Sequence, residues 1–317
     1  MRKMRQKDFY RAMVMLFFFA AFGLHAKGQE YPWTLQYVNN MNTVNPAFVG
    51  MWDKAGFMVT TRKDYVSIDG AAFYQQLSLY TPVKNTESGV GLNIVKRNIG
   101  FERQLNISFD YSYQVRLDMY NYLRLGLRAG ISNYSPNLDK YQLYPDRVPD
   151  PEFLTDVNHQ FMTIFGFGGV IFNDDYYISL SVPQVISNTF QANRDGYSSL
   201  QEFKTAYLSG GYAFKLPMSV RLRPNLLLVG TVGKPVYFDL SGTVYFPGNL
   251  QFGLSLRSNK ATCLSGQYTF ANNLRVGFAS EYAVFQDISR FQVGTYEILV
   301  GYDFNLYRKK NVKPNYF

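Results

Sequence analysis

The chain has 317 residues, of which 17% are aromatic and only 17% are charged. So many aromatic residues exclude a disordered chain, and a mean hydropathy of −0.18 excludes a bundle of apolar membrane helices. The net charge of +9 is carried by basic residues within 1–28 and 308–313, so the body between them offers no basic stripe of the kind that binds nucleic acid.

The first predicted element is a leader over residues 1–28. A basic stretch, 1–11, is followed by an uncharged apolar stretch, 12–24, and then by Ala26-Lys27-Gly28. This three-part layout is typical of a secretory signal peptide, here cleaved before Gln29. An uncleaved anchor helix is the alternative, but the apolar stretch is short for a span that needs about 20 residues. The sequence therefore predicts export.

Residues 29–54 form a second unit that has no regular period. The segment is polar and aromatic, with Trp33, Tyr37, Trp52 and several Asn. Two locations remain open for it: it hangs in the periplasm, or it folds into the lumen of a barrel as a plug.

From residue 55 onward the chain alternates between apolar and polar residues, which is the period of a β-strand. In 104–116, Leu105, Phe109 and Tyr113 share one face with other apolar residues, while the residues between them are polar. In 295–304 the alternation has one exception, Leu299. No helical period stands out in this part of the chain.

About fourteen such segments occur, and most are 8–13 residues long. That length suits a tilted strand that crosses a bilayer, which needs about 9–11 residues. The predicted strands lie near 55–62, 71–81, 88–97, 102–116, 120–132, 160–172, 175–182, 203–214, 219–231, 236–246, 249–258, 262–270, 273–282 and 294–304.

A soluble β-sandwich would alternate in the same way, but three features favour an all-β transmembrane antiparallel barrel over 55–306. The strands are long, and their ends are rich in Tyr and Phe, as interfacial girdles are. The polar faces hold glycine and charges of both signs, which suits a lumen crossed by structural ion pairs. These charged residues are Asp110, Arg124, Arg128, Asp239, Arg257, Arg275, Glu297 and Asp303.

The lengths of the connections give an independent test of the barrel. Bacterial barrels have short periplasmic turns and longer outer loops. The three longest connections, near 133–159, 183–202 and 283–293, all follow odd-numbered strands, whereas turns such as Asn173-Asp174 follow even-numbered ones. With the N-terminus in the periplasm, the long connections face outward and the basic tail, 307–317, is periplasmic. This tail could meet an acidic partner or be a flexible end.

Motifs for catalysis, cofactors or metals are not found. Cys263 is the single cysteine, and His25 and His159 are the only histidines, so the usual zinc sites and nucleophile–histidine pairs are excluded. Asp174-Asp175 could meet calcium in a loop, but it lacks a ladder of ligands and reads as solvated charge. We expect no catalytic, cofactor-binding or metal-binding residues, and hence no enzyme.

The most specific motif lies in the N-terminal segment. It reads Trp33-Thr34-Leu35-Gln36-Tyr37 and then Asn45-Pro46-Ala47-Phe48-Val49-Gly50. This resembles the opening signature of the PorP/SprF family of type IX secretion outer-membrane proteins, an aromatic-x-x-Gln-Tyr run before Asn-Pro-Ala-aromatic-x-Gly. The residues that this resemblance marks as a partner-binding or plug motif are Gln36, Tyr37, Asn45, Pro46, Ala47, Phe48 and Gly50.

The similarity continues along the exported chain in the same order. Asp150-Pro151-Glu152-Phe153 resembles a family loop, and the strand at 177–183 resembles a family strand with Ser179 in place of the usual Gly. Tyr296-Glu297-Ile298 is similar to the closing His-Glu-Ile strand, with Tyr296 in place of His. Arg223-Pro224-Asn225 departs from the Pro-Ser that the family favours.

The resemblance implies a non-enzymatic barrel in the outer membrane of a Gram-negative cell, serving type IX secretion or gliding motility. Its implied partners are outer-membrane lipid, periplasmic secretion-ring lipoproteins, a peptidoglycan-binding lipoprotein, and a secreted protein with a C-terminal sorting domain. An outer-membrane porin or solute transporter is the alternative, because a barrel of this width can hold a modest channel. An outer-membrane hydrolase is disfavoured by the scarcity of histidine.

Overall fold

We describe the fold from a computed structural model, which places residues 34–52, 54–100, 102–136, 142–143, 148–149, 160–186, 189–191, 198–201, 204–283 and 294–304. The predicted leader 1–28, Trp33, the Asp150–Phe153 loop motif, His159 and the basic tail 307–317 lie outside the described residues.

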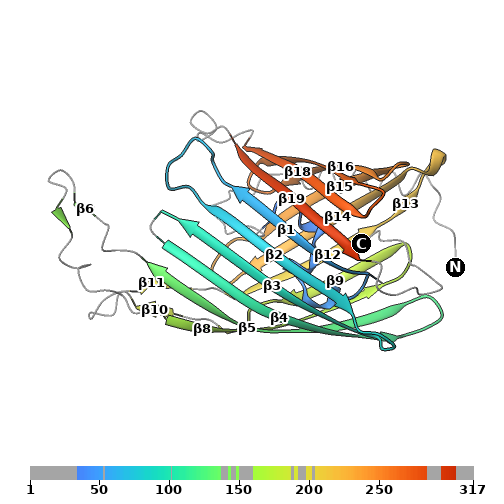
Figure 1. The fold of residues 1–317 in the computed structure, drawn as a ribbon, viewed down its shortest axis with the longest axis horizontal. Helices are drawn as coiled ribbons and strands as arrows, with labels where there is room; N and C mark the ends of the chain where they lie inside the picture. Colours follow the sequence, from blue (N-terminus) through green and yellow to red (C-terminus); the bar gives the residue numbers. More distant parts are fainter. Residues whose placement is uncertain are drawn as a thin grey trace.

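The described strands close into one antiparallel barrel (Figure 1). The main sheet has 15 segments, but β12 and β13 are two parts of one strand separated by Ala213, so the wall has fourteen strands. β12 pairs with both β9 and β14, and β1 pairs with β19, so the ring has no free end. This confirms the predicted fold class and strand number.

The wall strands have these bounds: β1 Ala55–Lys63, β2 Phe73–Pro82, β3 Ser88–Ile99, β4 Glu102–Arg116, β5 Tyr122–Pro136, β8 Gln160–Phe172, β9 Tyr176–Val182, β12 Thr205–Tyr212, β13 Phe214–Lys215, β14 Arg221–Thr231, β15 Tyr237–Phe246, β16 Leu250–Arg257, β17 Ala261–Thr269, β18 Leu274–Ala283 and β19 Thr295–Phe304. The strands that were expected from alternation differ by a few residues at their ends. The largest difference is in β5, because its ladder with β4 continues to the pair Glu102 and Pro136.

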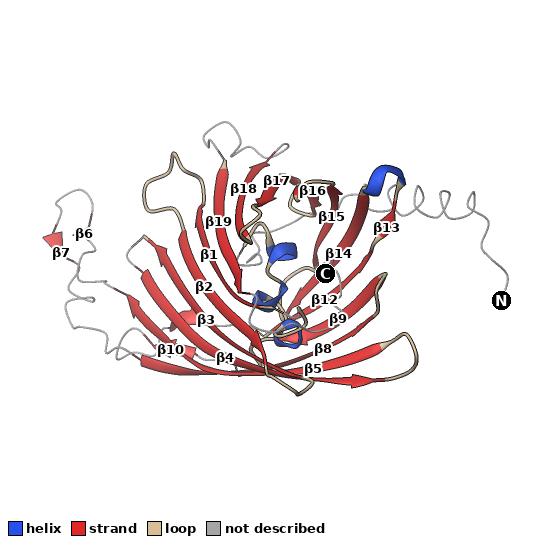
Figure 2. Ribbon diagram, turned by 45° about the vertical axis from the view of Figure 1, so that its right-hand side comes forward, coloured by secondary structure: helices blue, strands red, loops and turns tan. Residues whose placement is uncertain are grey.

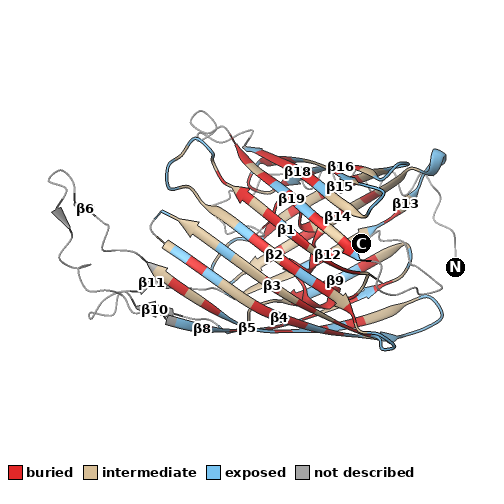
Figure 3. Ribbon diagram, in the orientation of Figure 1, coloured by how far each residue is buried: buried red, intermediate tan, exposed pale blue. Residues whose placement is uncertain are grey.

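Exposed and buried residues alternate along the wall strands (Figure 3), and large apolar residues are among the exposed ones. Phe109 is 51% exposed, Leu127 53% and Ile298 55%. The residues between them on the same strands, such as Asp110 and Glu297, are fully buried. This orientation is the one that a lipid-facing barrel requires. Leu299 breaks the alternation because it points inward and is buried in the lumen.

Aromatic pairs mark both ends of the wall. At the end where the chain enters β1, ring centroids are 4.6 Å apart for Tyr212–Phe214 and 4.8 Å for Tyr268–Phe270. At the opposite end Tyr282 and Tyr296 lie edge to face at 6.2 Å, and their hydroxyls are hydrogen-bonded. Such rings suit the interface between lipid tails and water, where an apolar ring and a polar hydroxyl each find a partner.

The longest connections lie at one end of the barrel, as the sequence predicted. The end of the barrel where β1 begins has short turns, such as 83–87, 117–121 and 173–175. The long connections lie at the opposite end: 137–159 contains the hairpin of β6 Gln142–Leu143 and β7 Val148–Pro149, and 183–204 contains that of β10 Thr189–Gln191 and β11 Ser198–Gln201. We call the first end the inner end and the second the outer end, because bacterial barrels have short periplasmic turns and longer outer loops.

The described residues also include four short 3₁₀ turns: η1 Tyr37–Asn39, η2 Met41–Thr43, η3 Pro46–Phe48 and η6 Pro217–Ser219. In the part of the chain that the structure describes, no helix has both the length and the apolar composition needed to cross a membrane.

The orientation of the wall predicts the effect of added charge. Leu127→Arg places a cation in lipid near the middle of β5 and should lower the free energy of unfolding by about 2–4 kcal/mol. Val66→Arg, in the outer connection 64–72, should cost less than about 1 kcal/mol. Urea unfolding of both variants from lipid vesicles measures the difference. Equal, small effects would mean that Leu127 does not face lipid.

Candidate functional site

The N-terminal segment lies inside the barrel. Figure 2 shows its 3₁₀ turns enclosed by the ring of strands. We call residues 34–52 the plug. Of the two locations that the sequence left open, the lumen is the one that the described residues occupy. The seven residues of the predicted partner-binding or plug motif are all buried there: Gln36, Tyr37, Asn45, Pro46, Ala47, Phe48 and Gly50. Whether they bind a partner stays a prediction.

The Asn-Pro-Ala-Phe motif builds η3. Asn45 is extended, as expected for a residue before proline, and its side-chain oxygen accepts a hydrogen bond from the Ala47 N–H at 2.8 Å. Pro46 opens the turn, where its missing N–H costs nothing. Gly50 then has φ +67°, a value that a side chain disfavours, and it turns the chain toward β1.

Asn45 also fixes the plug to the wall. Its amide nitrogen donates to the Ser179 hydroxyl at 2.8 Å and to the Gly169 carbonyl at 3.1 Å. One residue earlier, the carbonyl of Val44 accepts from the Ser181 hydroxyl at 2.6 Å. The position where the family favours glycine is therefore a hydrogen-bonding partner of the plug in this chain.

Glycines on the lumen side of the wall make room for the plug. A Cβ on Gly126 would lie 2.3 Å from the backbone nitrogen of Ala47, and one on Gly168 would lie 2.1 Å from the side-chain oxygen of Asn45. A Cβ on Gly89 would lie 2.4 Å from the carbonyl oxygen of Val49. Contacts this short exclude a side chain, so the plug and the wall fit each other at these three points.

One half of the lumen is apolar. There, plug side chains pack against β8, β9 and β14, and Phe48 meets Tyr177 edge to face with ring centroids 5.7 Å apart. The buried members of this cluster are Tyr37, Met41, Val44, Ala47, Phe48, Val170, Phe172, Tyr177, Ala213, Leu227, Val229 and Tyr237. The plug therefore has a hydrophobic core of its own, shared with the wall.

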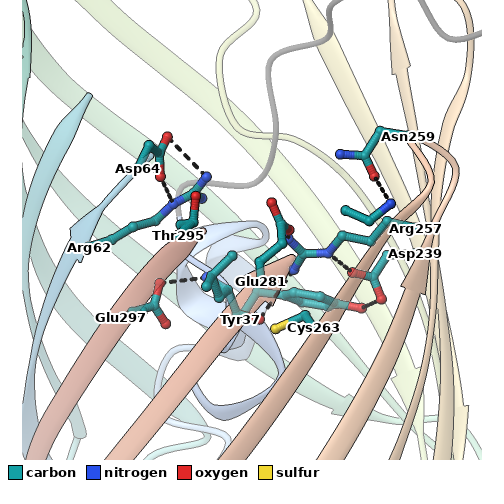
Figure 4. A network of polar contacts seen from close by, with 12 residues as sticks. Tyr37, Arg62, Asp64, Asp239, Arg257, Asn259, Cys263, Glu281, Thr295 and Glu297 are labelled. Atoms are coloured by element: carbon teal, nitrogen blue, oxygen red, sulfur yellow. Dashed lines mark hydrogen bonds and ion pairs between the residues drawn. The ribbon is translucent and has the colours of Figure 1, made fainter. Parts of the chain in front are cut away.

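The other half holds the plug through buried charge (Figure 4). The Glu297 carboxylate on β19 accepts hydrogen bonds from the backbone N–H groups of Leu35, at 2.5 Å, and Gln36, at 2.9 Å. Such charge-assisted bonds are about twice as strong as neutral ones. Glu297 stands opposite Arg62 in the ladder between β19 and β1, so the plug is tied to the junction of the first and last strands.

Arg257 is the centre of a second charged group. Its guanidinium donates to Asp239 at 2.8 Å and to Glu281, and also to the carbonyl of Leu35 at 3.4 Å. The Tyr37 hydroxyl donates to Asp239 at 3.3 Å. Burial, reinforced by the Asp239 carboxylate, raises the pKa of the Tyr37 phenol well above its usual value, so the hydroxyl keeps its proton.

A third anchor is the pair of Arg128 and Asp110, which lie opposite each other on β5 and β4. The two are joined at 2.7 Å, and Arg128 also donates to the carbonyl oxygens of Asn42, at 2.6 Å, and Thr43, at 3.3 Å. Arg275 and Asp303, at 2.8 Å, form a further pair near the inner end. Lumen ion pairs were expected from the sequence, but their role as plug ligands was not.

The lumen binds a segment of its own chain, the plug, through apolar packing and hydrogen bonds along much of its length. Among the described residues, no three His, Cys, Asp or Glu side chains gather in a way that could hold a metal ion. What the site does chemically is to satisfy the backbone groups of an irregular segment inside a barrel that has few other partners for them.

The fit at Gly126 predicts that a single methyl group loosens the plug. Gly126→Ala should make residues 34–52 accessible to protease in the folded protein and should cost about 1–3 kcal/mol, because the plug backbone must shift. Gly242→Ala is the matched control, since a Cβ there meets nothing within 4 Å. Limited proteolysis with mass spectrometry compares the two. Equal protection of the plug would contradict the steric fit.

The buried ion pairs of Arg257 should contribute more to the free energy of unfolding than an exposed ion pair does. Arg257→Met leaves Asp239 and Glu281 buried without their cation and should lower the free energy of unfolding by about 3–5 kcal/mol. Lys215→Met, which breaks the exposed pair with Asp175, should cost less than about 1 kcal/mol. Urea unfolding in lipid vesicles is the measurement. A similar cost for both variants would show that Arg257 is not a central cation.

No curated protein matches the chain. Similar solved structures include a deletion mutant of the TodX monoaromatic hydrocarbon channel, 12% identical with a TM-score of 0.46 over 83% of this chain and 93% of that one. A Pseudomonas aeruginosa FadL homologue is 13% identical with a TM-score of 0.46, over 88% and 96% of the two chains.

The outer-membrane protein Omp33 of Acinetobacter baumannii is 10% identical, with a TM-score of 0.43 over 80% of this chain and 99% of that one. The sequence itself gives the family. The model of the type IX secretion system membrane protein PorP/SprF matches residues 26–302, nearly the whole chain, and the chain therefore belongs to the PorP/SprF family.

Proposed function

We propose that this barrel is a non-enzymatic outer-membrane component of the type IX secretion machinery, and that it anchors or assembles periplasmic partners or a secreted surface protein. Family membership supports the link to secretion, and together with the barrel it points to the outer membrane. The observation that carries the anchoring role is the plug. A lumen packed with buried main chain and side chains favours a fixed scaffold over a conduit for an exported protein.

The turn between β4 and β5 supports a contact at the periplasmic end. The Asp118 carboxylate accepts bonds from the backbone N–H groups of Tyr120, at 2.7 Å, and Asn121, at 2.8 Å, and from the Asn121 side chain. The Asn121 side chain and these two N–H groups hold the pKa of Asp118 below its usual value. The ordered turn presents Met119 and Tyr120, each 73% exposed, to a partner.

Affinity purification from detergent-solubilised outer membranes tests the assignment. We expect the tagged chain to recover periplasmic secretion lipoproteins, and we expect its deletion to stop secretion of a reporter that carries a C-terminal sorting domain. Recovery of the barrel alone, together with normal secretion after deletion, would refute the proposal.

The exposed turn gives a sharper prediction. The double substitution Met119→Ser and Tyr120→Ser should reduce the recovery of periplasmic partners several-fold, because a buried aromatic contact commonly dominates an interface. Met218→Ser is the matched control, since Met218 is an exposed methionine on a different inner turn. Heat-dependent gel mobility verifies that each barrel is folded. Equal recovery from all three proteins would remove this turn from the interface.

Planar-bilayer recording separates the scaffold from a solute channel. A scaffold with a packed lumen should give no steady conductance, whereas a stable open pore would favour a porin or solute transporter. The same purified protein supplies a test of export, because mass spectrometry of the mature chain should find Gln29 at its N-terminus if residues 1–28 are a cleaved signal peptide.

A further inference from the structure

Many of the hydrogen bonds between the wall and the plug are made to the main chain of the plug. Six wall side chains, on six strands, form hydrogen bonds with backbone atoms of the plug. The bonds run from the N–H groups of Leu35 and Gln36 to Glu297, from Arg257 to the Leu35 carbonyl, from Arg223 to that of Val38, from Arg128 to those of Asn42 and Thr43, from Ser181 to that of Val44, and from Ser112 to that of Val49.

Main-chain atoms are common to all peptides. Contacts of this kind therefore give affinity without reading sequence, as they do where proteins bind peptides through backbone hydrogen bonds. Sequence enters where plug side chains also bond the wall, as those of Tyr37 and Asn45 do. It enters at Ala47 as well, because the side chain there is fully buried in the apolar cluster and a larger one has no room.

Space is freer near the other end of the plug. Residues 35–39 border a small polar cavity that lies between the plug and β15, β16 and β17. Its volume, measured as the space open to the centres of water molecules, is about 30 Å³. Two buried polar atoms line this cavity, the Ser255 hydroxyl and the side-chain amide oxygen of Gln267. Neither has a hydrogen-bond partner among protein atoms. Such groups call for water or for a polar side chain. Asn39 borders this cavity and bonds the wall through Gln251 at 3.1 Å, so a substitution there has room that the fully buried position of Ala47 lacks.

We propose that the lumen is a peptide-binding site, and that a polypeptide segment supplied by another molecule can take the place of the plug. The ligand class is an irregular segment with a small residue after proline, at the fully buried position of Ala47, and with room for substitution at the partly buried position of Asn39. The identity of the donor as a polypeptide rests on the proposed function, since a secretion component meets unfolded chains. The site itself rests on the contacts above.

The covalent link to β1 keeps the plug at a high effective concentration, of the order of millimolar, so a free peptide competes only when that link is cut. A protease site inserted after Asp53, between the plug and β1, allows the full-length chain to be folded first and nicked afterwards. The nicked plug should stay with the barrel on gel filtration. A fluorescent synthetic peptide of residues 34–52 in excess should then replace it with saturable binding.

Peptide variants test the division between backbone and side-chain recognition. The peptide with Asn39→Ala should bind within about threefold of the native peptide, and that with Ala47→Phe should bind at least about 30-fold more weakly. In the barrel, Glu297→Gln should weaken binding of the native peptide about 10- to 100-fold, because it removes a charged acceptor. Glu87→Gln, on an exposed inner turn, should leave the affinity unchanged.

The outcomes decide the proposal. Saturable binding to nicked but not to intact protein supports it. No binding to nicked barrel that heat-dependent mobility shows to be folded overturns it, and so does equal binding to intact and nicked protein. Because the assay uses purified protein, peptide binding together with normal secretion after deletion of the chain would refute the secretion role alone.

Discussion

Closure of the wall is the constraint on which the structure depends. In lipid no water is available to hydrogen-bond a free strand edge, so every wall strand needs a partner on both sides. The pairing of β1 with β19 and of β12 with both β9 and β14 meets this need. Once the ring is closed, each strand has one face in lipid, and all polar side chains must find partners in the lumen. The plug and the ion pairs supply them.

The plug answers two different requirements of the lumen. Against β8, β9 and β14 it contributes apolar side chains to a buried cluster. Elsewhere in the lumen it contributes backbone groups that hydrogen-bond the buried charges of Glu297 on β19 and Arg128 on β5. A segment without a regular period can do both, because its successive residues point in different directions. The same lumen is in this way both a core and a binding site.

The sequence was enough to predict the wall strands, which follow a repeating pattern, but not the location of the plug, which has none. Alternation is a local pattern, and it placed the wall strands and their lipid face correctly, including the odd position of Leu299. The plug has no period, so its place in the lumen could not be read from spacing. Lumen charges such as Arg128 were visible as inward residues, but the Thr43 carbonyl that Arg128 binds lies 85 residues earlier in the chain.

Glu297 has a consequence for assembly. It stands on the seam where the last strand meets the first, and its carboxylate is satisfied by the two N–H groups that open the plug. If β1 and β19 paired first, this carboxylate would be enclosed before its N–H donors arrived, and a buried acceptor would lack its hydrogen bonds. We therefore expect the plug to enter the barrel before β1 and β19 pair. Entry of the plug would then be coupled to the last step of barrel closure.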